Sequence, residues 1–451
     1  MRIVIVGGGR VGLAITKLLL LEGHDITVLE SDAARAEYLA TTCDVYVING
    51  RAEVEMLRDA GAAEADLLIA VTPSDEMNLI ACAVGKKLGA KHTIARVREE
   101  EYYQDMLLLR EELGLSMSIN PERSAAKEIS RTLRFPVAIK VEPFANRQVE
   151  LVEYQVSKHS KLRHAKIRDF RNNFSSGVLV CTLERDGQLF IPNGKFEIQA
   201  DDVLSLVGAP EEMHKLFRQI KEFRHETRSV MLIGGGRLSE RLGMELQGMH
   251  IRTTIVEQDM ERCLALKSVL QEADVICGDG TQPDVLIEEG INDVDAVVSL
   301  TESDAVNLVV SSFAQSHRIP KVITLLNEEH FLKLAESNGL TAIIQPPRVT
   351  AERIVEYVRW MQNSSHSSGV ETLRMISDGK AEALEFIAGQ EISFLNIPLK
   401  DLNLKDAILV AAITRGRKCI IPNGEDVIQH GDHVIVVTTL HGLKDLEDII
   451  R

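Results

Sequence analysis

The chain has 451 residues, 45% of them hydrophobic, and a mean hydropathy of −0.01. These values are ordinary for a globular protein and predict about three or four domains. The formal net charge of −16 argues against nucleic acid as a partner, because binding a phosphate backbone requires an excess of Lys and Arg. The same charge disfavours direct contact with an anionic bilayer and suits docking to a basic protein surface, such as the cytoplasmic loops of a membrane protein.

Neither a membrane span nor a secretory leader is expected. No apolar run approaches about 18 residues, and the first strand begins at Arg2 with no signal peptide before it. The cysteines form no Cys-x-x-Cys pair, so we expect small buried residues in a reducing cytoplasm and favour a redox role less. These cysteines are Cys43, Cys82, Cys181, Cys263, Cys277 and Cys419.

The first part of the chain alternates short apolar runs with helical patterns. We expect strands at 2–6, 25–30, 45–48, 67–71, 93–97 and 117–119. We expect helices at 13–20, 78–88 and 101–109. This alternation predicts a doubly wound parallel sheet.

A glycine motif, Gly7-x-Gly9-x-x-Gly12, follows the first strand and opens the first helix. Gly7 would permit a tight turn, Gly9 the approach of a pyrophosphate, and Gly12 close packing of the helix on the strand. Glu30 ends the second strand, where a carboxylate accepts hydrogen bonds from ribose hydroxyls and repels a 2′-phosphate. The motif predicts a site for NAD or an adenosine nucleotide rather than NADP; a Rossmann fold with an empty site is the alternative.

From about residue 140 the pattern changes. Two strands surround an Asp-Gly hairpin turn at residues 186–187, another strand is expected at 201–208, and an amphipathic helix at 211–220. This predicts a small α+β module of about 80 residues, which has too few residues for a large core and is expected to dimerise.

The second half repeats the first. Gly7, Thr72 and Ile191 return as Gly234, Thr301 and Ile421, which lie 227, 229 and 230 residues later. This offset indicates tandem duplication of a unit of about 225 residues, too large for a solenoid repeat. We therefore expect an α/β protein with two tandem Rossmann-like domains, each followed by a small α+β domain. The expected domains are 1–135, 136–225, 226–362 and 370–451, with a Ser/Gly-rich linker at 364–369.

The second copy of the glycine motif is incomplete. Ser239 stands where Gly12 stands in the first copy, Leu325 replaces Arg96, and Asp279 has an Arg at the matching place of the first half. The two sites should therefore differ, and nucleotide binding in the second half stays open. The candidate binding residues of the second copy are Gly234, Gly236, Arg237, Leu238, Glu257, Asp279 and Thr301.

Each Rossmann unit ends in a helix that begins with proline, at Pro121 and at Pro346. Such a helix has little sheet left to cover. It either packs on a neighbouring domain or remains an ordinary terminal helix, and the sequence does not separate the two.

No catalytic or metal-binding constellation accompanies the nucleotide motif. The small modules share turn and core residues at matched positions, not His, Lys or Arg, and none of the 13 histidines has a metal spacing. A P-loop of the type G-x-x-x-x-G-K-[ST] is also missing. A nucleotide site without catalytic groups favours a sensor; the alternatives are an NAD-dependent oxidoreductase, which would need a base beside the nicotinamide, and, less favoured, a ligand-gated transcription regulator.

The order of these motifs resembles the TrkA family, the regulators of bacterial and archaeal Trk potassium uptake, which carry two tandem RCK units, each a KTN domain followed by a TrkA-C domain. The resemblance covers nearly the full chain. The matching segments are the Gly-Gly-Gly-Arg-Val-Gly run at 7–12, Glu30, 70–78, 95–97, 120–125 and the Ile-Pro-Asn-Gly and Gly-Asp-x-Val motifs of the small modules.

The resemblance implies a set of binding residues in the first half. Phosphates would be held at the glycine turn, a ribose by Glu30, and further phosphates, in a neighbouring subunit, by Arg96 and Arg98. The full set is Gly7, Gly9, Arg10, Val11, Gly12, Glu30, Thr72, Asp75, Asn78, Arg96 and Arg98.

The resemblance also implies ligands and partners. Family members bind NAD or NADH and ATP or ADP, and assemble as a ring, here a tetramer with eight units. The ring lies in the cytoplasm against the inner face of the membrane, beneath a potassium-translocating partner of the TrkH or TrkG type.

Overall fold

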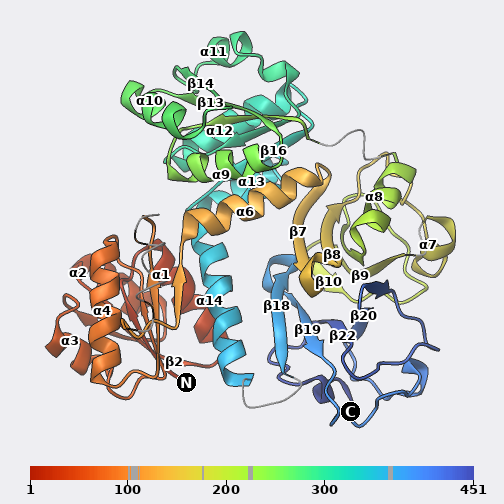
Figure 1. Cartoon of the computed structure of the whole chain (residues 1–451). Coiled ribbons are helices and arrows are strands. Elements are labelled where there is room, and N and C mark those ends of the chain that lie inside the picture. The colour runs from red at the N-terminus through yellow and green to blue at the C-terminus, as the bar shows by residue number, and fades with distance from the viewer. Residues whose placement is uncertain (100–101, 103–109, 111, 175–176, 222–226, 364–368) are drawn as a thin grey trace.

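The computed structural model describes residues 1–99, 102, 110, 112–174, 177–221, 227–363 and 369–451. It contains two parallel sheets, one at the lower left of Figure 1 and one at the top, and two antiparallel sheets that lie side by side at the right. The helix expected at 101–109 and the linker residues 364–368 fall outside the described residues.

The first parallel sheet has the doubly wound topology expected from the sequence. Its strands are β1 (Arg2–Val6), β2 (Asp25–Glu30), β3 (Tyr46–Asn49), β4 (Leu67–Ala70), β5 (His92–Arg96) and β6 (Met117–Ile119). Its helices are α1 (Arg10–Leu21), α2 (Ala33–Thr42), α3 (Val54–Asp59), α4 (Asp75–Leu88) and α6 (Pro121–Arg134). The order β3-β2-β1-β4-β5-β6 reverses direction next to β1, and the switch point lies at the glycine turn that follows this strand.

The second parallel sheet repeats this order as β14-β13-β12-β15-β16-β17. Its strands are β12 (Ser229–Ile233), β13 (Arg252–Glu257), β14 (Asp274–Cys277), β15 (Ala296–Ser299), β16 (Lys321–Leu325) and β17 (Ala342–Ile344). Its helices are α9 (Arg237–Gly248), α10 (Met260–Val269), α11 (Pro283–Glu288), α12 (Asp304–Ser316), α13 (Leu332–Ser337) and α14 (Pro346–Asn363).

The first antiparallel sheet has the order β10-β9-β11-β8-β7. It comprises β7 (Ala138–Phe144), β8 (Val149–Gln155), β9 (Val178–Arg185), β10 (Gln188–Phe190) and β11 (Val203–Gly208), with α7 (Ile167–Asn173) and α8 (Pro210–Gln219) beside it. Asp186 and Gly187 both have positive φ, at 52° and 76°, as a tight hairpin between β9 and β10 requires.

The second antiparallel sheet has the matching order β18-β19-β22-β20-β21. It comprises β18 (Val370–Ile376), β19 (Ala381–Ile387), β20 (Ile408–Arg415), β21 (Lys418–Ile420) and β22 (His433–Thr438). By the repeat, the helix expected at 211–220 should return at 443–450; the structure instead has a single 3-10 turn there, Leu446–Ile449. Leu446 and Ile449 are both buried, and a spacing of three places them on one side of a 3-10 turn.

The terminal helices of the two Rossmann units are exchanged between the halves of the chain (Figure 1). Helix α6 leaves the first sheet and packs on α9, where Ile129 and Leu133 share a core with Leu242. Helix α14 packs on α1, where Ile354 and Val358 are buried in one cluster with residues of that helix. Of the two readings of these helices, packing on a neighbour is therefore confirmed.

Buried ion pairs reinforce the exchange. Arg359 on α14 is only 3% exposed, and its guanidinium donates to both Glu22 at the end of α1 and Glu382 on β19. Arg134 on α6 lies 3.7 Å from Glu150 on β8 in the corresponding place. Each pair neutralises a carboxylate that would be costly to bury alone.

The two small sheets pack against each other within one chain, so the expected pairing of small modules is intramolecular. The contacts are reciprocal: the backbone N–H of Ala145 donates to Glu385 at 3.1 Å, and that of Ser377 donates to Glu153 at 2.6 Å. The apolar residues between the sheets include Phe144, Leu151, Cys181, Val207, Ile376, Ala383, Ala412, Ile435 and Val437.

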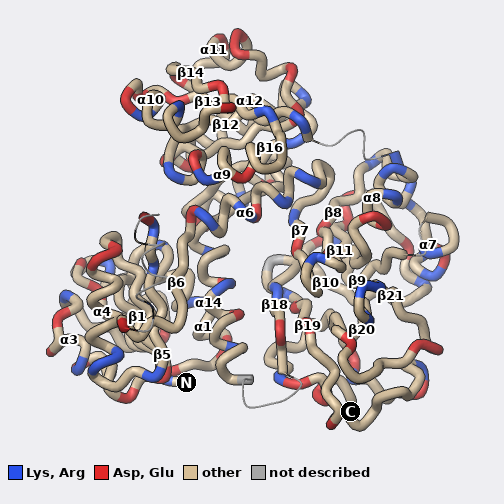
Figure 2. Tube along the Cα trace, viewed as in Figure 1, with Lys and Arg blue, Asp and Glu red and all other residues tan. Residues whose placement is uncertain are grey.

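Acidic and basic residues are interspersed over all four sheets and their helices (Figure 2). Within the described ranges, every helix is too short or too polar to traverse a bilayer. All six cysteines are free, and Cys43, Cys82, Cys181 and Cys263 are buried as expected. Cys277 is exposed, because it ends the edge strand β14.

Candidate nucleotide sites

The glycine turn of the first half is shaped by close backbone contacts. Gly7 has φ of +102°, and a β-carbon there would lie 3.0 Å from the backbone nitrogen of Thr72. A β-carbon on Gly12 would lie 1.9 Å from the carbonyl oxygen of Gly7. A side chain at Gly7 would require movement of the backbone after β4, and one at Gly12 would require movement of α1, which explains both glycines.

Gly9 has the opposite surroundings, because a β-carbon there would meet nothing within 4 Å. Gly9 is the N-cap of α1, and no side chain caps this helix. The first backbone hydrogen bond of the helix is the one that the N–H of Leu13 donates to the carbonyl of Gly9. The N–H groups of Arg10, Val11 and Gly12 therefore precede the helix ladder. Open space in front of unpaired N–H groups at a helix N-terminus fits an anion such as a pyrophosphate.

Glu30 lies at the C-terminal end of β2 and is buried. Its Oε2 accepts from the backbone N–H of Gly8 at 2.5 Å, and its Oε1 accepts from that of Asp32 at 2.8 Å. These bonds fix the carboxylate beside the turn. A carboxylate has about four acceptor positions, so capacity for a ribose hydroxyl remains.

Three polar residues that the resemblance placed beside the ligand hold the loops of the site together. Asn78 is fully buried; its Oδ1 accepts from the backbone and hydroxyl of Thr72 at 2.7 and 2.8 Å, and its Nδ2 donates to the carbonyl of Arg96 at 2.9 Å. Asp75 accepts from the N–H groups of Arg98 and Glu99 at 2.7 and 2.9 Å. Asn78 and Asp75 therefore join the ends of β4 and β5.

Arg96 ends β5, and Arg98 lies two residues beyond that strand. Arg98 donates to the carbonyl of Pro73 at 2.6 Å. The Nε atoms of both arginines are buried without a hydrogen-bond partner among the described residues. Burial, then the charges of Arg98 and, more weakly, of Arg237, lower the pKa of Arg96, which means that the cations of the two halves are close.

The second glycine turn has the same backbone form. Gly234 has φ of +99°, and a β-carbon on Gly236 would meet nothing within 4 Å. Ser239 replaces the packing glycine, and its hydroxyl donates to the carbonyl of Gly234. Glu257 repeats the contacts of Glu30, with Oε2 accepting from Gly235 at 2.6 Å.

The surroundings of the second turn differ, in a way that the sequence did not predict. Arg262 on α10 donates through Nε to the carbonyl of Gly235 at 2.6 Å and through its terminal nitrogen to Glu240 at 2.7 Å. Glu240 stands on the first turn of α9, where the first half has Leu13. A carboxylate there opposes a phosphate at the same helix N-terminus. The mismatch between Leu13 in the first copy and Glu240 in the second is the sequence signal that could have revealed this difference.

Arg237, on the second turn, lies 2.5 Å from Glu99 of the first half, and both side chains are 51% exposed. The second site therefore contacts Glu99 across the boundary between the halves, and Arg237 interacts electrostatically with Arg96 there. The remaining predicted residues have local roles. Leu238 is buried in the core that α9 covers. Thr301 binds Asn307 as Thr72 binds Asn78, and Asp279 accepts hydrogen bonds from Thr281 and Gln282 of its own loop.

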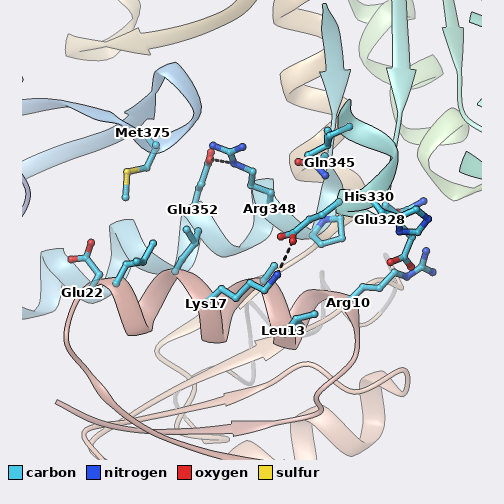
Figure 3. A pocket seen from close by; sticks show the side chains of 18 of the residues that line it. Arg10, Leu13, Lys17, Glu22, Glu328, His330, Gln345, Arg348, Glu352 and Met375 are labelled. Atoms are coloured by element: carbon cyan, nitrogen blue, oxygen red, sulfur yellow. Dashed lines mark hydrogen bonds and ion pairs between the residues drawn. The ribbon is translucent and has the colours of Figure 1, made fainter. Parts of the chain in front are cut away.

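A cavity of 710 Å³ between the halves runs along α1, beside the first glycine turn and not at it (Figure 3). Lys17 on α1 reaches across it to Glu329 at 2.7 Å, and Arg348 and Glu352 pair along α14 at 3.0 Å. Arg10 lines the same cavity, opposite the segment that follows β16. The facing residues of that segment are Asn327, Glu328, Glu329 and His330.

No group of three or more His, Cys, Asp or Glu residues with the geometry of a metal site occurs in the ranges that the structure describes. The two glycine turns are the candidate sites, because the backbone N–H groups at the start of α1 and α9 suit an anionic ligand.

Comparison with known proteins follows the same division of the chain. The TrkA-N domain model matches residues 3–121 and 230–346, and the TrkA-C domain model matches residues 151–221 and 392–451. The Trk system potassium uptake protein TrkA homolog of Archaeoglobus fulgidus is 32% identical, with 100% of each chain covered. The Trk system potassium uptake protein TrkA of Halomonas elongata is 31% identical, with 100% of this chain and 99% of that protein covered.

Among solved structures, the GsuK RCK domain matches with a TM-score of 0.62 at 17% identity, covering 97% of this chain and 92% of that one. The GsuK channel bound to NAD matches with a TM-score of 0.62, covering 97% and 76%. At this identity the likeness shows the fold alone. The two domain models and the relatives that match end to end place the chain in the TrkA family of Trk system potassium uptake proteins.

Proposed function

We propose that this protein is the cytoplasmic regulatory subunit of a potassium uptake system. It senses NAD or NADH, ATP or ADP, or both kinds of ligand, in its Rossmann domains, and it controls potassium flux through a membrane partner of the TrkH or TrkG type. It docks on that partner at the inner face of the membrane as a homo-oligomer, a tetrameric ring. Family membership supports the role in potassium uptake, and GsuK structures with NAD and with ADP support a nucleotide ligand.

One observation carries the nucleotide assignment. The turn at Gly9 is open, carries N–H groups that precede the helix ladder, and has the carboxylate of Glu30 fixed beside it. In this assignment the N–H groups hold the phosphates, Glu30 holds a ribose, and Gly7 and Gly12 keep the turn tight.

A ligand can change the conformation only through different affinities for two states. Arg237 is paired with Glu99 of the other half, so a phosphate that recruits Arg237 competes with a contact between the halves. Arg96 and Arg98 stand on the same side of the boundary as Glu99 and can take up added phosphate charge. Charge-assisted hydrogen bonds contribute about 1.5–3 kcal/mol each. This is enough to change the angle between the two halves of the chain, and such a change in each subunit would alter the shape of the proposed ring.

The first test is calorimetric titration of the full-length protein with ATP, ADP, NADH and NAD. Gly9→Glu places a carboxylate in the open space at the first turn and should abolish binding there; Gly236→Glu should do the same at the second. Gly248→Glu is the matched control. A β-carbon added at Gly248 would also meet nothing within 4 Å, but Gly248 lies at the far end of α9 from the turn. Unchanged binding in both turn variants would show that the glycine motif is only structural.

A second test separates the triphosphate from the diphosphate. Arg96→Ala should weaken ATP more than ADP, and an equal loss of both would remove the role of Arg96 in sensing phosphate charge. Potassium flux into liposomes that contain a TrkH-type protein should then depend on the added chain and on the ligand that titration identifies. Potassium flux that is the same with and without the added protein would refute the regulatory assignment and would leave the assignment of nucleotide binding intact.

A further inference from the structure

Two cysteine side chains lie beside the backbone of Glu257 and Gln258, at the second glycine turn. Cys263 on α10 directs its thiol to the carbonyl of Glu257 at 3.4 Å and lies 4.0 Å from the carbonyl of Ile276, the residue before Cys277. Cys277 ends β14, and its sulfur lies 3.8 Å from the carbonyl of Gln258. The two thiols also interact with each other electrostatically.

The pair belongs to one half of the duplicated chain. Cys277 is the register partner of Glu257, and Asn49 is the register partner of Glu30 in the first half. Cys263 lies four residues after the helix cap Asp259, where the first half has Ala36 after Asp32. The first half therefore has an amide and a methyl group in the places of the two thiols, and it serves as an internal reference.

The two thiols have different surroundings. Cys277 is exposed on the edge strand of the sheet, so a small oxidant can reach it. Cys263 is buried, and burial together with the neighbouring thiol raises its pKa to about 11. An accessible thiol beside a protected one is the arrangement of a reacting and a resolving cysteine.

We propose that Cys263 and Cys277 are a reversible redox pair that a peroxide converts to an intramolecular disulfide. The thiolate of Cys277 attacks the peroxide oxygen, the O–O bond breaks, and Cys277 becomes a sulfenic acid while the peroxide leaves as an alcohol or water. The sulfur of Cys263 then attacks the sulfenic sulfur, its proton leaves with the hydroxide as water, and the S–S bond forms. The two thiols together lose two electrons to the peroxide, and a dithiol reductant returns them.

The disulfide would act on the second site through Glu257. Cys263 now donates to the carbonyl of this residue, which also accepts from the N–H of Gly278 at 2.9 Å. Oxidation removes the first donor and ties the edge strand β14 to α10. This consequence rests on the proposed nucleotide site, whereas formation of the disulfide does not.

The test uses the full-length protein, reduced and then treated with hydrogen peroxide. Remaining thiols are alkylated, and peptides are mapped by mass spectrometry without reduction. The expected product joins the peptides of Cys263 and Cys277, is two hydrogens lighter than the pair, stays within one chain, and disappears with dithiothreitol. Cys419→Ser is the matched control, since Cys419 is partly buried on a different domain and its loss should leave the link intact.

Two variants keep the result interpretable. Cys263→Ser should leave Cys277 as a sulfenic acid that dimedone traps, and Cys277→Ser should leave Cys263 unoxidised at the same peroxide dose. A link between two chains, a link to Cys419, or oxidation of Cys277 to sulfinic acid while Cys263 remains fully alkylated would each overturn the proposal. If the disulfide forms but titration with the four nucleotides is unchanged in the Gly9→Glu background, the pair stands and its action through Glu257 is refuted.

Discussion

The two Rossmann units have the same strand order and nearly the same turn, with φ of +102° at Gly7 and +99° at Gly234, yet their sites are different environments. The first turn is closely packed around Gly12, and Arg10, which follows the turn, lines a cavity together with the acidic segment 327–330. The second turn accommodates Ser239 and carries a fixed carboxylate beside it, and its Arg237 interacts with Glu99 and Arg96 of the first half.

This difference separates what the fold requires from what a ligand requires. The backbone of both turns is determined by contacts between strand, turn and helix, so it is the same in both copies. The charges around each turn come from side chains that are not part of this packing of strand, turn and helix, such as Glu240 and Arg262, and these have diverged. The first unit therefore offers the complete glycine motif, and the second has charged residues of the other half beside its turn.

The largest effect is expected from adding one methyl group to the tighter turn. Gly12→Ala places a β-carbon against a backbone carbonyl and must push α1 away, which should cost about 3 kcal/mol or more of unfolding free energy. Ser239→Ala, at the matching position, removes one hydrogen bond and should cost about 1 kcal/mol. Urea unfolding of both variants measures the difference, and equal costs would mean that the two turns are packed alike.

The second effect concerns Glu128 on α6, whose counterpart on α14 is Arg353. Burial, with Glu142 and Glu352 opposing Lys140 and Arg131, raises the pKa of Glu128 from 4.5 to about 7. A carboxyl with a raised folded pKa contributes stability that is complete below pH 4.5 and is lost as the pH rises through about 7.

Glu128→Gln removes this loss, so its melting temperature should exceed that of the parent at pH 8 and match it near pH 5. The difference at pH 8 corresponds to a free energy of unfolding on the order of 2 kcal/mol. Glu55→Gln on the exposed face of α3 is the control and should change neither value. A Gln variant with the parent's pH profile would place the titrating group elsewhere in the interface.

A smaller effect is expected from exchanging the residues that distinguish the two turns. In the Gly9→Glu background, Glu240→Leu removes the carboxylate beside the second turn and frees Arg262, which should strengthen ATP binding there about tenfold. In the Gly236→Glu background, Leu13→Glu should weaken ATP binding at the first turn. Calorimetry measures both constants, and changes of the same sign in the two swaps would contradict the electrostatic account.

The smallest effect is expected at the ion pair between the halves. Glu99→Gln breaks an exposed pair, so stability should change by less than about 1 kcal/mol. Release of Arg237 should nevertheless strengthen phosphate binding at the second turn by a few fold. Lys17→Gln breaks an ion pair across the cavity at the first turn and serves as the comparison. If Glu99→Gln leaves the ATP constant unchanged, the pair does not compete with the ligand.

The sequence predicted the parallel sheets, the duplication and the glycine turn, because each depends on local patterns such as the run from Arg2 to Val6 or the spacing of three glycines. It did not predict which helix each terminal helix contacts, since α6 and α14 have the same apolar pattern wherever they pack. Arg262, Glu240 and Glu99 were missed for the same reason: their partners lie 22 or more residues away and on other elements. The resemblance gave Asn78 and Asp75 as candidate binding residues, and the structure adds that both accept hydrogen bonds from backbone groups of the surrounding loops.

The exchanged helices also determine when the protein can fold during synthesis. Glu22 and Arg359 are separated by 337 positions, so the apolar face of α1 stays exposed to water until almost four-fifths of the chain has left the ribosome. At about 5–20 residues per second this delay lasts tens of seconds. The N-terminal half is therefore expected to be a client for chaperones while it waits, and truncated chains that end before α14 should aggregate rather than persist as free half-molecules.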